Sequence, residues 1–164
     1  MDIETVKTIL LNPDFWETVV KDTQECKKIS VIKKDESNVL HQEMILKIEI
    51  DSFGLIKRDI ETIQDIHFDF EESYENEEGI NIQKISVHVE NSNQLRKFNG
   101  IIKIEEKPGK ARITFTLEEI GITDVLVELL GIQLTNRRLK RGLRKVMQKV
   151  FDYSESGKLD QFTK

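Results

Sequence analysis

The stretch VKTILLNPDFWETVV, Val6–Val20, decides how the chain begins to fold. Asn12 can cap a helix whose first position is Pro13, so we expect two short helices, one on each side of this break. The second helix carries Phe15 and Trp16, the only tryptophan in the chain. Because such a short helix cannot bury two large aromatic side chains against itself, both must pack on other elements.

In the middle of the chain, apolar and polar residues alternate with a period of two. From Cys26 onward, apolar residues recur at every second position between turn signals, a pattern typical of half-buried strands. Several of the turns are short enough for antiparallel hairpins. Six strands are expected, at 26–34, 39–50, 55–70, 80–89, 97–106 and 112–119. The sequence therefore predicts an antiparallel meander, with the acidic stretch 69–79 as a solvated strand end and loop.

The residues 124–151 predict one long helix of roughly 40 Å. At 100° per residue its apolar face comprises Val125, Leu129, Ile132, Leu139, Leu143, Val146, Met147 and Val150. A second apolar arm, confined to the first half, predicts burial on more than one side there. The outer face of the second half carries Arg137, Arg138, Lys140, Arg141, Arg144, Lys145 and Lys149. Residues 152–164 have little periodicity, so we expect a frayed tail.

The totals favour a single domain over residues 1–164. With 38% hydrophobic and 34% charged residues the chain is typical of soluble proteins, and its first residues do not resemble a signal peptide. Its single cysteine excludes an internal disulfide and suits a reducing compartment. We therefore expect a cytoplasmic protein. The abundance of Lys, Glu and Ile resembles the compositional bias of thermophiles.

Two short helices, an antiparallel meander and one long C-terminal helix is the order of the helix-grip fold. The chain resembles the superfamily that includes START lipid-transfer domains, Bet v 1-like plant proteins and polyketide cyclases, and looks closest to a small single-domain family from thermoacidophilic archaea. The resemblance covers almost the whole chain and depends on the element order and on Val6–Val20. It implies an α+β fold in which a curved antiparallel sheet of about six strands wraps around the long helix.

The resemblance also implies a hydrophobic cavity between the sheet and the long helix, entered near the short helices. Phe15 and Trp16 would then lie at or beside the entrance, although they can equally be core residues that hold the short helices in place. Members of the superfamily usually begin with a strand, for which only residues 1–4 are available here. We therefore expect the first strand to be very short or missing.

The inward positions of the strands would line such a cavity. They are Leu40, Gln42, Met44, Leu46, Ile48, Ile50, Phe98, Gly100, Ile102, Ile104, Ile113, Phe115 and Leu117. These residue types suit an acyl or isoprenoid chain, but an ordinary filled core would use the same ones.

Arg58 lies between Ile56 and Ile60 in the alternation of its strand, which would direct its guanidinium inward. A buried guanidinium needs an anion. Three interpretations stay open: an ion pair with a protein carboxylate, a bulge that turns Arg58 outward, and a ligand carboxylate held by two parallel hydrogen bonds.

The polar residues Gln42 and Asn136 also lie in apolar positions, where each either orients a polar head group or satisfies a backbone group or buried water. The candidate ligand-binding residues are Arg58, Trp16, Phe15, Gln42, Met44, Phe98, Ile102, Phe115, Leu129, Gln133 and Asn136.

No catalytic motif is apparent. His41, His67 and His88 lack metal-ligand spacing and lie in the outward positions of their strands, so neither a metal site nor a cofactor is expected. The basic face of the long helix has no aromatic residues between its cations, which argues against nucleic acid. Its cations are either simply solvated or make transient contact with an anionic membrane or an acidic protein.

The leading hypothesis is a lipid-binding and transport protein, a carrier that encloses a long-chain fatty acid. The alternatives are a cyclase-like or hydrolytic enzyme on a hydrophobic substrate and a protein-interaction domain with a filled core. The oligomeric state, monomer or homodimer, stays open.

Overall fold

The structure is a computed structural model that describes residues 2–23, 26–35, 37–51, 55–108, 110–123 and 132–163. Side chains are described throughout these ranges except at 48–51, 55–58, 107 and 132–136. The described chain begins with helices α1 (Ile3–Leu10) and α2 (Pro13–Lys21), continues through strands, and ends with helix α4 (Ile132–Glu155) and the 3-10 helix η1 (Lys158–Phe162). The predicted α+β class is confirmed.

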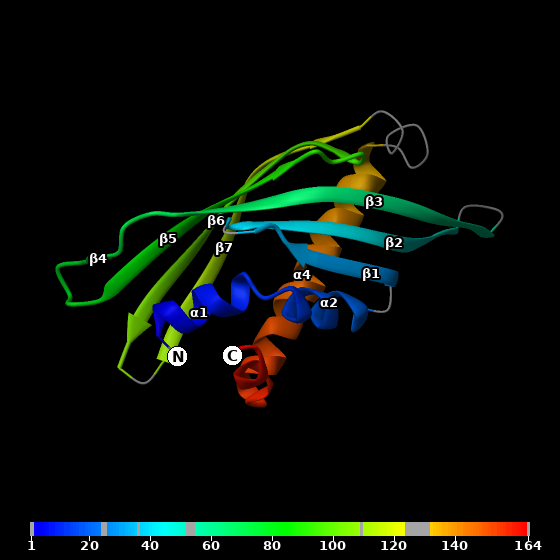
Figure 1. Ribbon diagram of the computed structural model, residues 1–164. Helices are drawn as coiled ribbons and strands as arrows, with labels where there is room; N and C mark the ends of the chain where they lie inside the picture. The colour runs from blue at the N-terminus through cyan, green and yellow to red at the C-terminus, as the bar shows by residue number, and fades with distance from the viewer. Residues whose placement is uncertain are drawn as a thin grey trace.

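The strands form one curved antiparallel sheet in the order β1-β2-β3-β5-β6-β7, with the short β4 paired to β5 (Figure 1). Their bounds are Cys26–Lys33, Val39–Asp51, Leu55–Phe70, Tyr74–Glu75, Asn81–Glu90, Leu95–Lys107 and Lys110–Ile122 for β1 to β7. The predicted meander is confirmed. Within the described ranges there is one strand more than predicted, because two residues of the acidic stretch pair as β4.

The two short helices begin as the sequence predicts. The Asp2 side chain accepts a hydrogen bond from the Thr5 N–H at 2.7 Å and caps α1. Asn12 caps α2 by accepting from the N–H groups of Asp14 and Phe15. Among the described residues no strand precedes α1.

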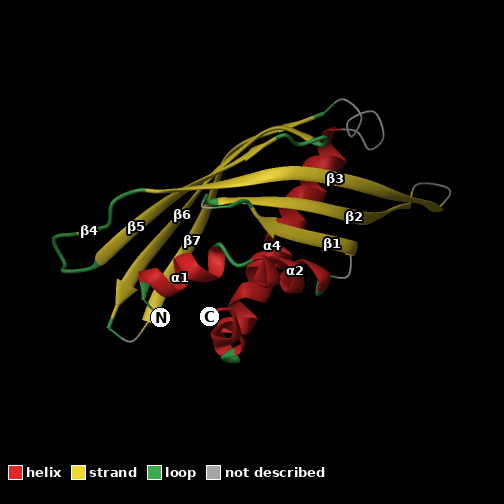
Figure 2. Ribbon diagram, in the orientation of Figure 1, coloured by secondary structure: helices red, strands yellow, loops and turns green. Residues whose placement is uncertain are grey.

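The described helices lie on one side of the sheet (Figure 2). One group of buried apolar residues joins α1 to the inner face of the sheet, around Leu40, Phe68 and Ile85. A second group joins α1, α2, α4 and η1, around Phe15, Val19 and Tyr153. Helix α4 contacts α2 and η1 and runs beneath the sheet. The described residues therefore form two apolar clusters, one on the sheet and one among the helices.

The long helix ends at Glu155, slightly beyond its predicted end. Its predicted first part, 124–131, lies outside the described residues. None of the described helices combines the length and apolar character that crossing a membrane requires.

The predicted frayed tail is corrected by the structure. Gly157 adopts a φ of 71°, and the chain then turns into η1. Leu159 and Phe162, three residues apart, are buried against α1 and α2, and the Asn12 side chain donates to the carbonyl of Phe162 at 3.1 Å. The sequence pattern missed this tail because two apolar residues are too few to show a period.

Candidate functional site

A cavity of about 380 Å³ lies between the inner face of the sheet and α4. The strands β2, β3, β5, β6 and β7 contribute apolar side chains such as Met44, Ile66 and Phe98. The helices α1, α2 and α4 contribute others, such as Leu10, Trp16 and Val146. The cavity has a size in the range typical of small-molecule sites and is built from both apolar clusters.

The structure places seven of the predicted binding residues around this cavity. They are Phe15, Trp16, Gln42, Met44, Phe98, Ile102 and Phe115. Of the other predicted lining positions, Leu46 and Ile113 also border the cavity. Leu40 and Ile104 are fully buried but do not border it, and neither do Gly100 and Leu117. The side chains of Ile48 and Ile50 lie outside the described ones.

Four predicted residues cannot be placed at the cavity by their side chains. Leu129 lies outside the described residues, and so do the side chains of Arg58, Gln133 and Asn136, whose backbones belong to β3 and α4. The backbone of Arg58 pairs with Ile48 of β2 in a register that runs without interruption from Val39–His67 to Asp51–Leu55. The β2–β3 register therefore contains no bulge at Arg58.

Phe15 and Trp16 have different surroundings. Phe15 is only 1% exposed and makes edge-to-face contacts with Trp16 and Phe162, at centroid distances of 5.1 and 5.5 Å. Trp16 stacks on Phe68 of the sheet at 6.3 Å, and its indole N–H donates to the carbonyl of Leu10 at 2.7 Å. The two aromatics therefore link α2 to η1 and to the sheet, which answers what they pack against.

A pair of buried amides lies in the cavity wall. The side chain of Gln64 on β3 donates to that of Gln42 on β2 at 2.6 Å. Both side chains are less than a tenth exposed, and Thr62 lies beside them on β3. Gln42 was predicted from its inward position, whereas Gln64 and Thr62 were not, although they alternate with Ile60 and Ile66 in the same way on β3.

Two positions on α4 give the helical wall of the cavity a cationic side chain and an open space. Arg138, which the helical pattern had assigned to the outer face, borders the cavity and is half-buried. Gly142 also borders the cavity, and a β-carbon added there would meet no atom within 4 Å. A mid-helix glycine destabilises a helix by about 1 kcal/mol relative to alanine. Here it leaves space open in the cavity instead of relieving a clash.

A surface hollow lies beside the cavity, between β7 and α4. It shares Phe115, Leu143 and Met147 with the cavity lining. The basic residues Lys140 and Arg144 line it, together with Phe151, whose side chain is 57% exposed. Cations and an apolar surface thus meet close to the cavity, between β7 and α4.

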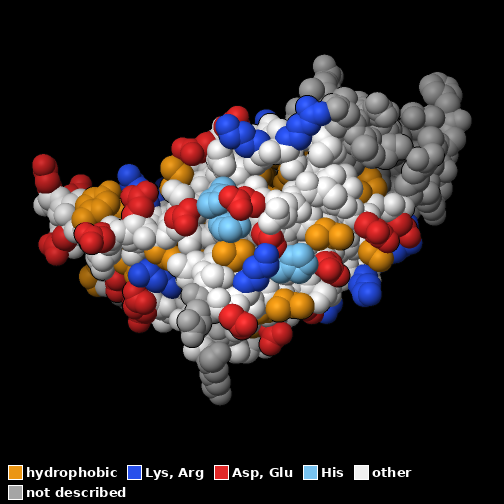
Figure 3. Space-filling view, turned by 45° about the horizontal axis from the view of Figure 1, so that its top comes forward, with side chains coloured by type: hydrophobic (Ala, Val, Ile, Leu, Met, Phe, Trp, Pro, Cys, Tyr) orange, Lys and Arg blue, Asp and Glu red, His pale blue; other side chains and the backbone are white. Residues whose placement is uncertain are grey.

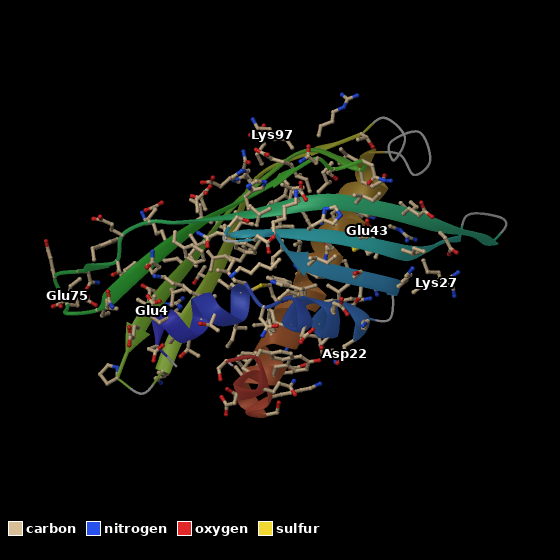
Figure 4. All side chains as sticks on the ribbon, in the orientation of Figure 1. Glu4, Asp22, Lys27, Glu43, Glu75 and Lys97 are labelled. Carbon is tan, nitrogen blue, oxygen red and sulfur yellow. The ribbon has the colours of Figure 1, made fainter. Side chains whose placement is uncertain are left out.

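The opposite, outer face of the sheet carries most of the charged side chains of the strands, together with the exposed Ile32 and Ile63. Figure 3 shows histidine side chains among acidic and basic ones on this face, and Lys97 in Figure 4 extends from the sheet away from α4. His41, His67 and His88 are 30%, 25% and 33% exposed, as expected for outward positions.

Asp65 is the one deeply buried carboxylate of this outer face among the described residues, with a side chain that is 4% exposed. Burial raises its pKa, but hydrogen bonds from Lys34, Asn91 and His41, each 2.7 Å long, outweigh burial and hold the pKa well below its usual range. The hydrogen bond between His41 and Asp65 also raises the pKa of His41. This group is a structural network that joins β2 and β3 to the residues directly after β1 and β5.

Comparisons with protein-family models, with curated proteins and with solved structures gave no match for this chain.

The described lining residues of the cavity comprise apolar, amide, hydroxyl and cationic side chains, with no carboxylate, imidazole or thiol among them. A wall of this kind can enclose an apolar chain and hold a neutral or anionic head group.

Proposed function

We propose that this protein has the helix-grip fold of START and Bet v 1-like proteins and carries a long-chain fatty acid in the cavity between the sheet and α4. The carrying observation is the apolar cavity of about 380 Å³, with open space preserved at Gly142. The order of the elements and the curved sheet over α4 support the fold assignment.

The acyl chain supplies most of the binding free energy in this proposal. Each buried methylene contributes up to ~0.8 kcal/mol, so affinity rises with chain length until the cavity is full. The apolar side chains on the facing walls, such as Phe98 on the sheet and Val146 on α4, provide the surface that the chain contacts.

The head group lies beside a cation or the amide pair. Arg138 borders the cavity, and a guanidinium matches a carboxylate through two parallel hydrogen bonds. Gln42 and Gln64 can donate to a carboxylate or a neutral head group once their mutual hydrogen bond opens. Arg58 stays a third candidate from its place in the β3 sequence alternation.

Trp16 provides the readout for the first experiment, because it is the only tryptophan and it borders the cavity. We would titrate purified protein with saturated fatty acids of increasing length and record Trp16 fluorescence, with native mass spectrometry to count bound ligands. Saturable binding of one fatty acid that tightens with length is expected. Absence of binding, or affinity independent of length, would overturn the proposal.

Substitutions at Gly142 separate the cavity from folding. Gly142→Phe places a ring in the open space and should weaken fatty-acid binding at least tenfold, whereas Gly142→Ala should bind nearly as wild type does.

Arg138→Ala should weaken binding of fatty acids more than that of the corresponding alcohols. The matched control is Arg137→Ala, because Arg137 is the neighbouring cation and is exposed. Equal losses in both arginine variants would remove Arg138 from the site.

The exposed cations of α4 suit the delivery of such a ligand. Arg137, Lys140, Arg141 and Arg144 are exposed, and two of them line the hollow that shares residues with the cavity. We propose that they bring the protein to anionic membranes. Added salt should then at least halve its binding to anionic vesicles. Salt-independent binding would contradict this part of the proposal.

A further inference from the structure

Two histidines lie side by side on the outer face of the sheet. His67 of β3 and His88 of β5 are directly opposite in the strand register, so their side chains share one face. Their rings stack at a centroid distance of 4.6 Å and an interplanar angle of 16°. Neighbouring residues of both strands, such as Val87 and Phe68, point to the cavity side instead. The histidine pair is therefore separate from the proposed lipid site.

Glu90 completes a group of three. Its carboxylate lies 3.4 Å from Nε2 of His67 and 3.5 Å from Nε2 of His88. One ligand atom from each of the three residues can be chosen so that all lie within 4.8 Å of one another. Ligand atoms around a tetrahedral Zn²⁺, with bonds of about 2.1 Å, are separated by about 3.4 Å. The two distances from Glu90 to the histidines already have this length, and the three ligand atoms need to approach within the 4.8 Å group to hold one such ion.

Asp69 supplies the support that a metal-binding histidine usually has. Its carboxylate oxygen lies 3.2 Å from Nδ1 of His88. A proton held on Nδ1 by this carboxylate leaves the lone pair of Nε2 free, on the side where Glu90 lies. Carboxylates in this second position orient the imidazole and increase its basicity as a ligand. This contact is a separate indication that the His88 ring is arranged for coordination.

We propose that His67, His88 and Glu90 form a binding site for Zn²⁺ or a similar divalent transition metal on the outer face of the sheet. Imidazole nitrogens combined with one carboxylate suit these metals better than Mg²⁺ or Ca²⁺, which prefer oxygen ligands. Three protein ligands leave a fourth tetrahedral position for water. The site is accessible, since the side chains of His67, His88 and Glu90 are 25%, 33% and 55% exposed.

The sequence did not indicate this site because the two histidines are far apart along the chain. Only the β3–β5 pairing brings them together, and the position of Glu90 two residues after His88 places it on the same face. Because side chains alternate between the two faces of a strand, His88 and Glu90 of β5 lie on the same face as His67 of β3 and cluster with it.

The test is titration of chelator-treated, tag-free full-length protein with Zn²⁺ by calorimetry, and with Co²⁺ by visible absorption. One metal per chain with micromolar or tighter affinity is expected. His67→Gln, His88→Gln and Glu90→Gln should each weaken Zn²⁺ binding at least tenfold. Asp69→Asn should weaken it about 10- to 100-fold while the Co²⁺ spectrum keeps its shape, because Asp69 is a positioning residue. The matched control is His41→Gln, another histidine of this face, which should bind as wild type does.

A second measurement on the wild-type protein avoids any effect of substitution on folding. Substoichiometric Cu²⁺ should broaden the NMR signals of His67 and His88 first and leave those of His41 sharp. Absence of metal binding, unchanged affinity in the His67 and Glu90 variants, or broadening centred on His41 would each overturn the proposal. None of these outcomes bears on fatty-acid binding, so the two proposals can fail separately.

Discussion

Gly100 and Gly142 lack side chains for opposite steric reasons. A β-carbon on Gly100 of β6 would approach the Phe115 ring to 2.8 Å, whereas one on Gly142 would meet no atom within 4 Å. Gly100→Ala should therefore lower the free energy of unfolding by about 1–3 kcal/mol through overpacking. Gly142→Ala should raise it by about 1 kcal/mol through helix propensity. Urea unfolding of the two variants checks both, and a stabilised Gly100 variant would show that Phe115 can move aside.

His41 makes stability depend on pH. The hydrogen bond to Asp65, with a weaker one to Glu43, raises the pKa of His41 above its ordinary value of 6.5. Since the folded state binds the proton more tightly than the unfolded state, this stabilisation is complete below pH 6.5 and is lost as the pH rises through the folded pKa.

Replacement of His41 should remove that dependence. His41→Asn should lose more unfolding free energy at pH 5 than at pH 9, measured by urea unfolding in the presence of a chelator. An NMR titration of the wild-type ring should give a midpoint above 6.5. A midpoint at or below that value would contradict the assignment, as would equal losses at both pH values.

At the scale of elements, η1 connects the C-terminus to the N-terminal helices. Phe162 and Leu159 are 4% and 3% exposed, and Phe162 contacts Phe15. The hydroxyl of Tyr153 on α4 also donates to the carboxylate of Asp22, labelled in Figure 4 at the end of α2. Helix α4 is thus held at its C-terminal end by α2 and η1.

Loss of a buried side chain from η1 should therefore destabilise the fold. Phe162→Ala should lower the free energy of unfolding by about 3–5 kcal/mol, because a large buried ring is lost and a cavity is left. The control is Thr163→Ala, an exposed neighbour, which should change it by less than about 0.5 kcal/mol. Urea unfolding measures both. Equal stability of the two variants would show that the tail is frayed in solution.

The edge of β1 shows how a short helix can protect a sheet. The carboxylate of Glu17 on α2 accepts a hydrogen bond from the backbone N–H of Val31 at 3.0 Å. An exposed edge strand offers unpaired backbone groups to other chains. The Glu17 side chain of α2 therefore satisfies one backbone group of this edge.

At the scale of the whole molecule, a ligand in the cavity would join two apolar clusters. One lies on the sheet and the other among the helices, and the cavity has residues of both in its wall. A fatty acid at 100 times its dissociation constant should stabilise the fold by about 2.7 kcal/mol and raise Tm. Thermal unfolding with and without ligand checks this. Gly142→Phe should show little shift, and a full shift in that variant would place the ligand elsewhere.

The sequence by itself determined the class of fold and the order of its elements. Period-two alternation, the Asn12–Pro13 break and the amphipathic C-terminal helix are local signals, so they predicted the meander, both short helices and α4. Alternation also predicted which side chains of β2, β6 and β7 face inward, among them Gln42, Met44 and Phe115.

Only the tertiary structure decided the features that need two distant segments. These are the open space at Gly142, the amide pair of Gln42 and Gln64, the burial of Phe162, and the meeting of His67 with His88. The physical reason is that periodicity says which way a side chain points from its own element. Whether that direction ends in a neighbour, a cavity or water depends on strand pairing and on how closely the layers pack.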